Sequence, residues 1–549
     1  MHKLNRALSG LLVAAALVAC QDALQVTNTN NPDRARVLAR PTDLEALIKG
    51  TFKTTFNGTY GTNGVAPSAR TIAWEHASAL NNFGMGPRSS IPRQAVDNSR
   101  SNTFYTNNEA DFNALQRAAR AAADGIHTIP LVSLGSAQLD ARGRAFAWFG
   151  LGVALGYVSM VYDSAAIPDP FEDLGIVPDL FGYADVYAAA LAALDSAKTW
   201  SDTARVKGYL AGTMLTSEWL NGATYTADEF IRLIRSYKAY FRANVARTPA
   251  DRAAVNWTLV RDDALAGITA TISISTGAGS GWTATMNAWQ QDATWNQFAN
   301  IIAGMADSTV TPYEAWLATP DASKDRFLVR TPDLRFPSGD IRATQNTNSP
   351  TVPSGRLYVR NNAPGLDVDA RPWNSQYSWY RMQAWVNNAG GTGPFPFFPK
   401  AMNDLLLAEA QIRLGNLAAA ATLIDLTRTT SGLPALSTGA PSWVSTATAT
   451  TPGPGGNACV PHIPQSPAYT TTACGNIMEM MKWEYRMETM YVSYGSQWFS
   501  SRGWGDLPEG TPIHWPVPYG EMDTRQKVMY NLGGVGREGG SVGKGNYGY

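Results

Sequence analysis

Histidine, cysteine and charged side chains are all scarce in this chain of 549 residues. It has five His and three Cys, and 16% of its residues are charged, with 44 basic and 44 acidic side chains. No HExxH motif, G-x-S-x-G elbow or Walker loop occurs, and no basic stripe invites nucleic acid. We therefore predict no catalytic residues, no cofactor, no metal and no nucleic-acid partner, although glycosidase carboxylates need no local motif.

The apolar run near the N-terminus is too short to span a bilayer. It covers residues 7–19 and stops at Cys20, whereas a membrane helix needs about 20 apolar residues. The letters LVAC that end the run resemble the bacterial lipobox, and Gln21 follows where an inner-membrane retention aspartate would stand. We expect residues 1–19 to be a lipoprotein signal peptide and Cys20 to carry an outer-membrane lipid anchor. An ordinary secretory signal with a chance cysteine is the alternative.

The other two cysteines, Cys459 and Cys474, bracket a segment rich in Pro and Thr. Such a pair at close spacing in an exported protein is typical of a disulfide. Closing a loop of about 15 residues contributes roughly 3 kcal/mol in the chain-entropy model. A zinc site is the alternative, but only His462 lies nearby, so four ligands are not available locally.

Apolar side chains recur at helical spacing in several segments. We predict helices at 138–162, 183–200, 202–220, 226–246, 400–415, 417–430 and 475–494. Thr226 with Glu229 three residues later forms a capping-box pattern. The 400–430 pair resembles a tetratricopeptide hairpin with Gly415 at its turn, and such hairpins stack because one cannot bury its own face.

The uncharged run Ala145–Val161 is the second long apolar segment. Its length is at the lower limit for a membrane span, and Gly152 and Gly156 are spaced as in a membrane-helix dimer. It also contains Ser159 and lies among amphipathic helices. A buried core helix, in which glycines allow close helix contact, is therefore favoured over a span.

Long segments rich in Gly, Asn, Thr, Pro and aromatic residues separate the helices. Loops of this length are typically functional or disordered, and their aromatic content argues against disorder. We predict a mostly α fold of tetratricopeptide-type hairpins with long irregular insertions. Residues 20–549 would form one domain, with a helical scaffold at about 110–266 and 400–495 and a loop-rich ligand-binding part at about 50–110 and 270–400.

Motifs at both ends of the mature chain resemble the SusD/RagB family of nutrient-uptake outer-membrane lipoproteins. The letters LEALIKGTF match an early family helix, Glu484, Arg486 and Glu488 match its acidic-basic helix, and WPVP with Glu521 matches its closing turn. The usual glutamate-glycine pair is replaced here by TMYVSYGSQW. The resemblance implies a SusD-like fold, a position on the cell exterior and a SusC-like TonB-dependent transporter as partner. Ligand identity does not carry over, because the family's binding loops differ between members.

Two aromatic regions, 74–88 and 282–316, are the predicted ligand site. The candidate residues are Trp74, Asn81, Asn82, Phe83, Arg88, Trp282, Trp289, Trp295, Tyr313 and Trp316. Aromatic faces beside amide side chains suit a neutral polar ligand, an oligosaccharide or else a peptide. Packing of the same rings in a core is the alternative, and residues 371–385 are the next region to consider.

Other functions remain open at this point. A surface glycoside hydrolase would need a carboxylate pair such as those in PDPFED, although solvated loop acids are favoured there. Asp367 and Asp369 alternate as in a calcium loop without completing one. A helical scaffold that recruits other proteins is the third hypothesis. The predicted function is binding of a nutrient at the cell surface and its delivery to a transporter, without catalysis.

Overall fold

The computed structural model describes residues 37–61, 63–78, 84–172, 177–289, 296–364, 373–388 and 390–549. Cys20 and the predicted signal peptide lie outside these residues. The longer helices are α3 (Pro41–Phe56), α6 (Thr106–Thr128), α7 (Ala137–Val161), α8 (Tyr183–Val206), α10 (Ala227–Asn244), α12 (Trp257–Leu265), α15 (Thr311–Ala318), α18 (Lys400–Arg413), α19 (Leu417–Arg428), α20 (Ile477–Thr489) and α21 (Ser496–Trp504). The short ones are α4 (Ala66–Ile72), α5 (Met85–Ser89), α9 (Ser217–Leu220), α11 (Pro249–Ala253), α13 (Thr285–Trp289), α14 (Asn300–Ala303), α16 (Arg342–Thr347), α17 (Gln383–Asn387) and α22 (Tyr519–Thr524). The prediction of a mostly α fold is confirmed.

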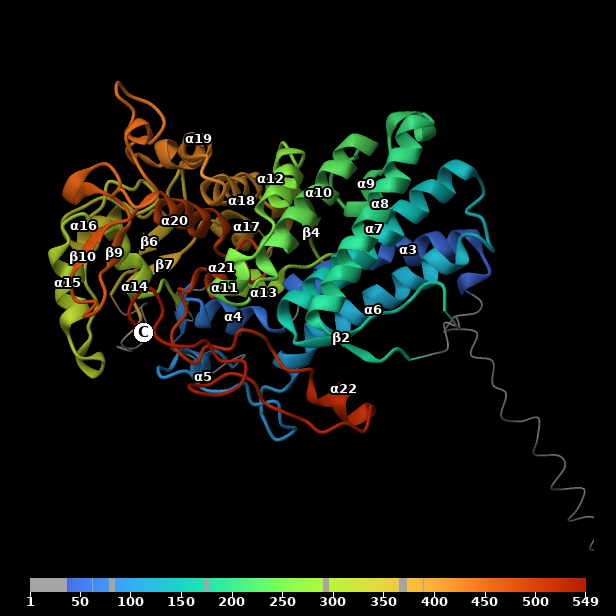
Figure 1. The fold of residues 1–549 in the computed structure, drawn as a ribbon, viewed down its shortest axis with the longest axis horizontal. Coiled ribbons are helices and arrows are strands. Elements are labelled where there is room, and N and C mark those ends of the chain that lie inside the picture. Colours follow the sequence, from blue (N-terminus) through green and yellow to red (C-terminus); the bar gives the residue numbers. More distant parts are fainter. Residues whose placement is uncertain are drawn as a thin grey trace, which may run out of the picture.

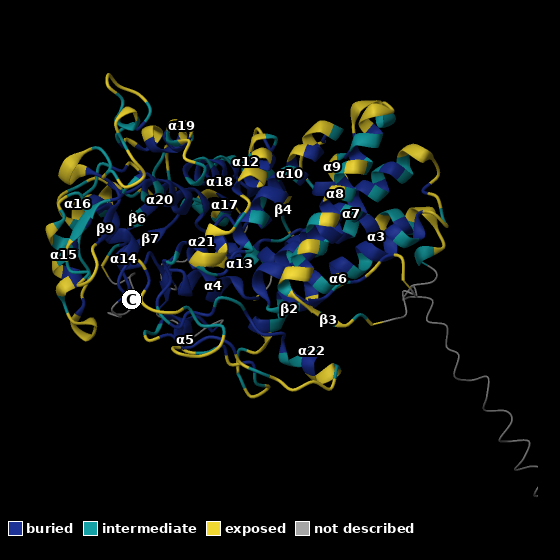
Figure 2. Cartoon of the chain, in the orientation of Figure 1, coloured by how far each residue is buried: buried dark blue, intermediate teal, exposed yellow. Residues whose placement is uncertain are grey.

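The long helices of the first half pack side by side at one end of the molecule (Figure 1). Helix α7 contacts α3, α6 and α8 extensively, and α10 packs against α8 and α12. Helix α10 begins at the predicted capping box, in which Thr226 accepts from the backbone of Glu229 and the Glu229 carboxylate accepts in return. The apolar faces of these helices merge into one large core, and exposed residues are confined to loops and outer faces (Figure 2).

Helix α7 is the buried core helix that its sequence predicts. Among the described residues it alone is long and apolar enough to cross a membrane. In its apolar 18-residue stretch, however, 89% of the residues are buried inside the protein. A Cβ on Gly152 would meet Leu194 of α8 at 2.7 Å, and one on Gly156 would collide with Phe241 of α10. The two glycines therefore permit the close approach of α8 and α10.

Helices α18 and α19 form the predicted hairpin. Helix α18 ends at Arg413, and Gly415 in the turn that follows has a φ of 80°, the left-handed conformation that glycine adopts without strain. The hairpin packs on α20 and on α12. The segment 202–220 differs from prediction. Helix α8 runs on to Val206, a 3₁₀ turn follows at Tyr209–Gly212, and only Ser217–Leu220 is α-helical again. Gly208 and Gly212, both at positive φ, explain the interruption.

Short two-stranded antiparallel ribbons occupy the irregular part of the described chain. The strands are β1 (Ala77–Ser78) with β5 (Asn296–Gln297), β2 (Ser164–Ala166) with β3 (Leu180–Gly182), β4 (Ile272–Thr276) with β8 (Gly393–Phe398), β6 (Val359–Asn361) with β7 (Tyr377–Trp379), and β9 (His462–Pro464) with β10 (Thr472–Cys474). A second hydrophobic core, rich in Trp and Tyr, includes residues of β1, β6, β7 and β9 and lies at the other end of the molecule, whereas β4 and β8 contribute to the first core (Figure 1). The loop-rich segments are therefore packed structure.

Candidate functional site

The two aromatic regions predicted to form the site come together through a pair of short strands. In the β1–β5 ribbon, Ala77 lies opposite Gln297 and Ser78 opposite Asn296. The region 371–385 joins them, because the N–H of Asn300 donates to the carbonyl of Trp373 at 2.9 Å. Three segments that are far apart in the sequence thus converge on one end of the molecule.

The rings from these segments form a continuous buried layer. Trp74 lies 5.0 Å from Trp373, Trp316 lies 6.0 Å from Trp373, and Tyr549 lies 4.8 Å from Trp373 between ring centroids. Trp74 and Trp316 are only 3% and 4% exposed. Trp74 also has a φ of 64°, a left-handed conformation that costs a non-glycine residue about 1–3 kcal/mol and persists only under tight packing.

Burial corrects four of the ten predicted ligand contacts. Trp74, Tyr313 and Trp316 belong to the second core, so they support the site from beneath and do not present a face to a ligand. Trp282 lies in the other core, against Phe52 and Phe56, and is separate from the site. The physical reason is that large aromatic side chains fill the interior of an irregular domain as readily as they line its surface.

The remaining predicted residues have different outcomes. Trp289 is 45% exposed at the end of α13. Arg88 is 9% exposed and lines a cavity of about 210 Å³. Four of the ten lie outside the described residues, namely Asn81, Asn82, Phe83 and Trp295. The calcium-like pair at 367 and 369 lies outside them as well.

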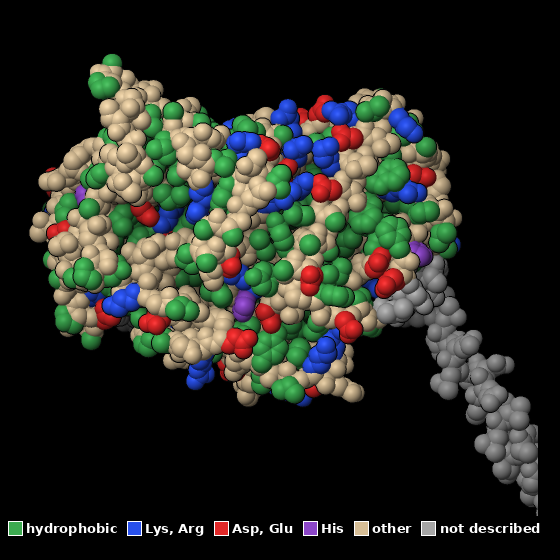
Figure 3. Space-filling model, viewed as in Figure 1, with side chains coloured by type: hydrophobic (Ala, Val, Ile, Leu, Met, Phe, Trp, Pro, Cys, Tyr) green, Lys and Arg blue, Asp and Glu red, His purple; other side chains and the backbone are tan. Residues whose placement is uncertain are grey.

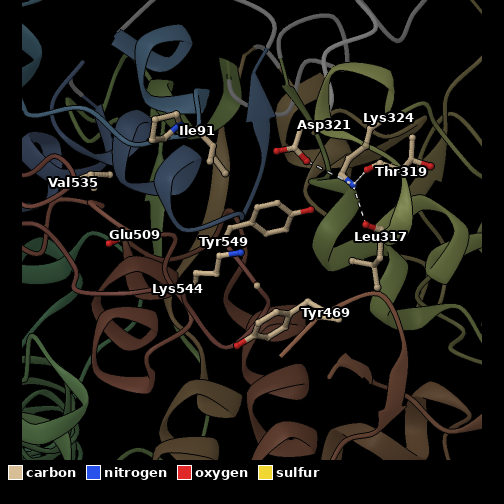
Figure 4. Close-up of a pocket in the computed structure, with 13 residues that line it drawn as sticks. Ile91, Leu317, Thr319, Asp321, Lys324, Tyr469, Glu509, Val535, Lys544 and Tyr549 are labelled. Atoms are coloured by element: carbon tan, nitrogen blue, oxygen red, sulfur yellow. Dashed lines mark hydrogen bonds and ion pairs between the residues drawn. The ribbon is translucent and has the colours of Figure 1, made fainter. Parts of the chain in front are cut away.

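A pocket of about 360 Å³ adjoins the aromatic layer at Tyr549 and at Leu317, the residue after Trp316 (Figure 4). Tyr469 and Tyr549 provide its aromatic surface, and Leu317 and Ile91 add apolar contact. Figure 4 shows the Tyr549 hydroxyl directed toward the side of the pocket where Leu317 and Lys324 lie. The pocket's size falls within the range of small-molecule sites, and its lining combines apolar and polar groups as such sites do.

Polar groups surround the two tyrosines. Lys324 is buried and donates to the carbonyls of Trp316 at 2.8 Å and Thr319 at 2.6 Å, which satisfies the C-terminal end of α15. Asp321 lies 3.6 Å from the Lys324 ammonium and keeps an exposed carboxylate. Burial raises the pKa of the Tyr549 phenol, and nearby Asp321 raises it further. Tyr549 is therefore a neutral hydroxyl that can donate or accept a hydrogen bond.

The tail of the chain is folded so that these tyrosines face the pocket. The carbonyl of Tyr549 accepts from the N–H groups of Glu509 at 3.1 Å and Gly545 at 2.6 Å. Gly548 has a φ of 97°, and a Cβ there would meet the Tyr469 ring at 2.6 Å. A side chain at position 548 would therefore displace Tyr469, so glycine is needed for the two segments to meet.

Sequence reasoning missed Tyr469 and Tyr549 because both lie in segments without a periodic pattern. Tyr469 follows the turn-rich letters SPA, and Tyr549 stands in a Gly-rich tail. The tail holds two tyrosines, of which Tyr547 is 1% exposed in the second core and Tyr549 lines the pocket. The local sequence therefore did not distinguish the pocket tyrosine from the core tyrosine.

The structure joins Cys459 and Cys474 in a disulfide, with Cα atoms 5.9 Å apart. His462 Nε2 lies 3.4 Å from the Cys459 sulfur, so these three residues form the cluster of metal-ligating side chains within the described chain. Both sulfurs are consumed by the disulfide, and a thiolate is the form that binds metal. The cluster therefore has one available ligand, the His462 imidazole, as long as the disulfide is intact.

Comparison with known proteins yields similar solved structures. No protein-family model matches the chain, and no curated protein matches it. A SusD superfamily protein from Bacteroides thetaiotaomicron has a TM-score of 0.47 and 14% identity, covering 88% of this chain and 97% of its own. A SusD-like protein from Bacteroides fragilis has a TM-score of 0.48 and 12% identity, covering 86% and 88%. A chitin-binding SusD homolog from Flavobacterium johnsoniae has a TM-score of 0.46 and 11% identity, covering 82% and 85%. All three are described as SusD-like, and SusD/RagB is the family whose motifs the sequence resembles.

Proposed function

We propose that this protein is a lipid-anchored outer-membrane receptor that binds a saccharide in the pocket of Tyr469 and Tyr549 and passes it to a TonB-dependent transporter. The observation that carries the proposal is the pocket itself, which is lined by two tyrosines and by charged side chains. The phenol of one of these tyrosines, Tyr549, is neutral. Sugar rings stack apolar C–H faces on aromatic rings while their hydroxyls need oriented hydrogen-bonding groups. The lipobox at Cys20 and the family resemblance of the sequence support the location and the partner.

Binding without turnover is part of the proposal. Of the acids considered as an alternative glycosidase pair, Asp169 and Glu172 are exposed, and Asp173 lies outside the described residues. Asp169 accepts a hydrogen bond from the N–H of Phe171 in its own loop. No residue of the described part of this loop lines the tyrosine pocket. A saccharide that binds should therefore be recovered unchanged after long incubation with the protein.

The test is to remove one wall of the pocket and measure binding across an oligosaccharide array, followed by calorimetric titration of the best ligand. Tyr469 is half-buried, so Tyr469→Ala should lower affinity roughly tenfold or more while the melting temperature changes little. Tyr549→Phe, which keeps the ring against Trp373 and deletes the hydroxyl, should lower affinity less.

The matched control is Tyr209→Ala, because Tyr209 is another half-buried tyrosine and lies at the far end of the helical half. It should leave affinity unchanged. Unchanged affinity in a folded Tyr469→Ala protein would contradict the proposed site. Trp74 and Trp316 are unsuitable for this test, because emptying a buried Trp position costs about 3–5 kcal/mol and mixes unfolding with lost contact.

A further inference from the structure

A second cavity adjoins the tyrosine pocket across a single loop. Ile91 and Pro92 line the tyrosine pocket, whereas Arg88, Gln94 and Ala95 on either side of them line a cavity of about 210 Å³. The rest of that cavity is polar, with Asp97, Asn102 and Asn107 beside the ring of Phe104. One extended ligand can therefore contact both hollows around the loop 84–97.

Arg88 differs from the other buried arginines that lack a carboxylate partner. Arg247 donates to the carbonyls of Ser159 and Tyr162, and Arg502 donates to those of Met160, Ile513 and Asn244. Their guanidinium groups thus satisfy backbone carbonyls, several of them at the C-terminal end of α7.

Both terminal nitrogens of Arg93 are used. This side chain is 3% exposed, lies over the Trp74 ring at 5.0 Å, and donates to the carbonyls of Arg88, Ser90 and Ile72. It is not among the residues that line the tyrosine pocket or the cavity at Arg88. Its positive charge nevertheless adds to the field at its neighbour Arg88.

Arg88 keeps spare hydrogen-bonding capacity toward the cavity. In the described part of the chain its guanidinium donates one hydrogen bond, from Nη1 to the Ala95 carbonyl at 3.2 Å, and it lies over the Trp515 ring at 5.9 Å. Its buried Nε has no hydrogen-bond partner there, as is also the case for Arg93, Arg247 and Arg502. Its only neighbouring acid among the cavity residues is Asp97, which is exposed, forms no ion pair with it and accepts from the N–H of Ser99 at 3.0 Å. A buried guanidinium without a counter-ion is costly, and a planar anion satisfies it in a bidentate manner.

We infer that the cavity at Arg88 binds the negatively charged group of the ligand, a carboxylate or a sulfate, so that the saccharide taken by this protein is acidic. This inference rests on the proposed function and narrows it to one ligand class. It departs from the sequence-based expectation of a neutral polar ligand. The tyrosines hold sugar rings, and Arg88, with Asn107 beside it, holds the charged substituent of a neighbouring ring.

The experiment uses matched glycans that differ in charge alone. An array carries oligogalacturonates beside their methyl esters and sulfated galactans beside their desulfated forms. The full-length protein should prefer the charged member, and titration of the pair with the strongest signal should give a preference of about tenfold or more, the usual scale of a charged hydrogen bond. Arg88→Gln should abolish the preference while affinity for the neutral member stays the same.

Two further variants keep the test decisive. Arg232→Gln removes an exposed guanidinium from α10 and the same unit of charge, and it should retain the preference. Asp97→Asn removes the acid at the cavity and should tighten binding of the charged glycan a few-fold. Should Arg88→Gln fail to fold, Arg88→Lys keeps the charge without the planar fork and should reduce the preference.

The outcomes separate this inference from the proposed function. Binding of neutral glycans with no preference for charge, or a preference that survives Arg88→Gln, overturns the acidic-ligand inference and leaves the tyrosine pocket standing. Weaker binding of the charged glycan by Asp97→Asn overturns it as well, since Asp97 would then act as the counter-ion of Arg88. Absence of every glycan signal, charged or neutral, overturns both.

Discussion

Some buried arginines of this protein have a carboxylate partner, whereas those of the loop 84–97 have none in the described part of the chain. Near the hairpin α18–α19, Arg252 pairs with Glu409 at 2.5 Å, and beside α20 Arg335 pairs with Asp333 and Glu484 at 2.8 and 2.7 Å, all of them essentially unexposed. In the loop 84–97, Arg88 and Arg93 are also buried but have no ion pair in the described part of the chain.

This difference separates structural charges from available ones. Arg252 and Arg335 tie elements together and receive carboxylate counter-ions, whereas Arg247 and Arg502 tie elements together through backbone carbonyls. Where a cavity adjoins the guanidinium, as at Arg88, the fold leaves the charge uncompensated. On the face shown in Figure 3, acidic side chains lie among the basic ones.

The largest expected effect comes from breaking a compensated pair. Glu409→Gln keeps the size of the side chain but leaves Arg252 as an uncompensated buried cation, which typically costs 3–5 kcal/mol. We expect the free energy of unfolding, measured by urea titration, to fall by about that amount. The double variant Arg252→Met with Glu409→Gln should recover much of the loss. A loss below about 1 kcal/mol in the single variant would show that the pair is not a structural charge.

Two buried glutamates, Glu409 and Glu75, should make the stability depend on pH in opposite directions. The Arg252 and Arg413 guanidiniums outweigh the effect of burial and lower the pKa of Glu409 from its ordinary 4.5 to about 2. Between pH 4.5 and 2 the folded state then binds fewer protons than the unfolded state, so this stabilisation is lost as the pH falls through that window. The difference corresponds to about 3 kcal/mol.

Glu75, near the aromatic layer, should act in the other direction. Burial raises its pKa from 4.5 to about 7, although Arg70 opposes the shift. The folded state then keeps a proton that the unfolded state has lost, so stability falls as the pH rises from 4.5 to 7. The free energy of unfolding should be measured at several pH values. In Glu409→Gln it should no longer fall as the pH is lowered from 4.5 to 2, and in Glu75→Gln it should no longer fall as the pH is raised from 4.5 to 7. Identical pH profiles for wild type and both variants would contradict these assignments.

The smallest stability change is expected at Arg88. Arg88→Gln removes a buried charge that has no counter-ion and one hydrogen bond at 3.2 Å, so the two effects nearly cancel. We expect the free energy of unfolding to change by less than about 1 kcal/mol, in contrast to Glu409→Gln. A loss of several kcal/mol, measured by the same urea titration, would place Arg88 with the structural arginines.

The sequence predicted the helical half well because local patterns carry it. The period of apolar residues located α7, α10, α18 and α19, and the Thr226 capping box marked the start of α10 within one residue. These features depend on spacing along the chain, which a single sequence displays.

The exposure of each ring could not be predicted in this way. Trp74, Trp282 and Trp316 have the same local character as Trp289, yet the first three are buried and the last is half exposed. In an irregular segment no periodicity fixes which side of the backbone faces the core. The same reason hid Tyr469 and Tyr549, which become neighbours only because the tail folds back over the loop that ends at β10.

By itself the sequence determined most of the helices, the cap of α10 and the spacing that allows one disulfide, because each rests on a few consecutive residues. Only the tertiary structure decided which aromatics form the floor and which form the wall of the pocket. It also decided which arginines receive a counter-ion, since a carboxylate such as Glu409 meets Arg252 although the two are 157 positions apart in the sequence. Solvation and pairing are properties of the assembled surroundings, so the charge left open at Arg88 becomes visible only in three dimensions.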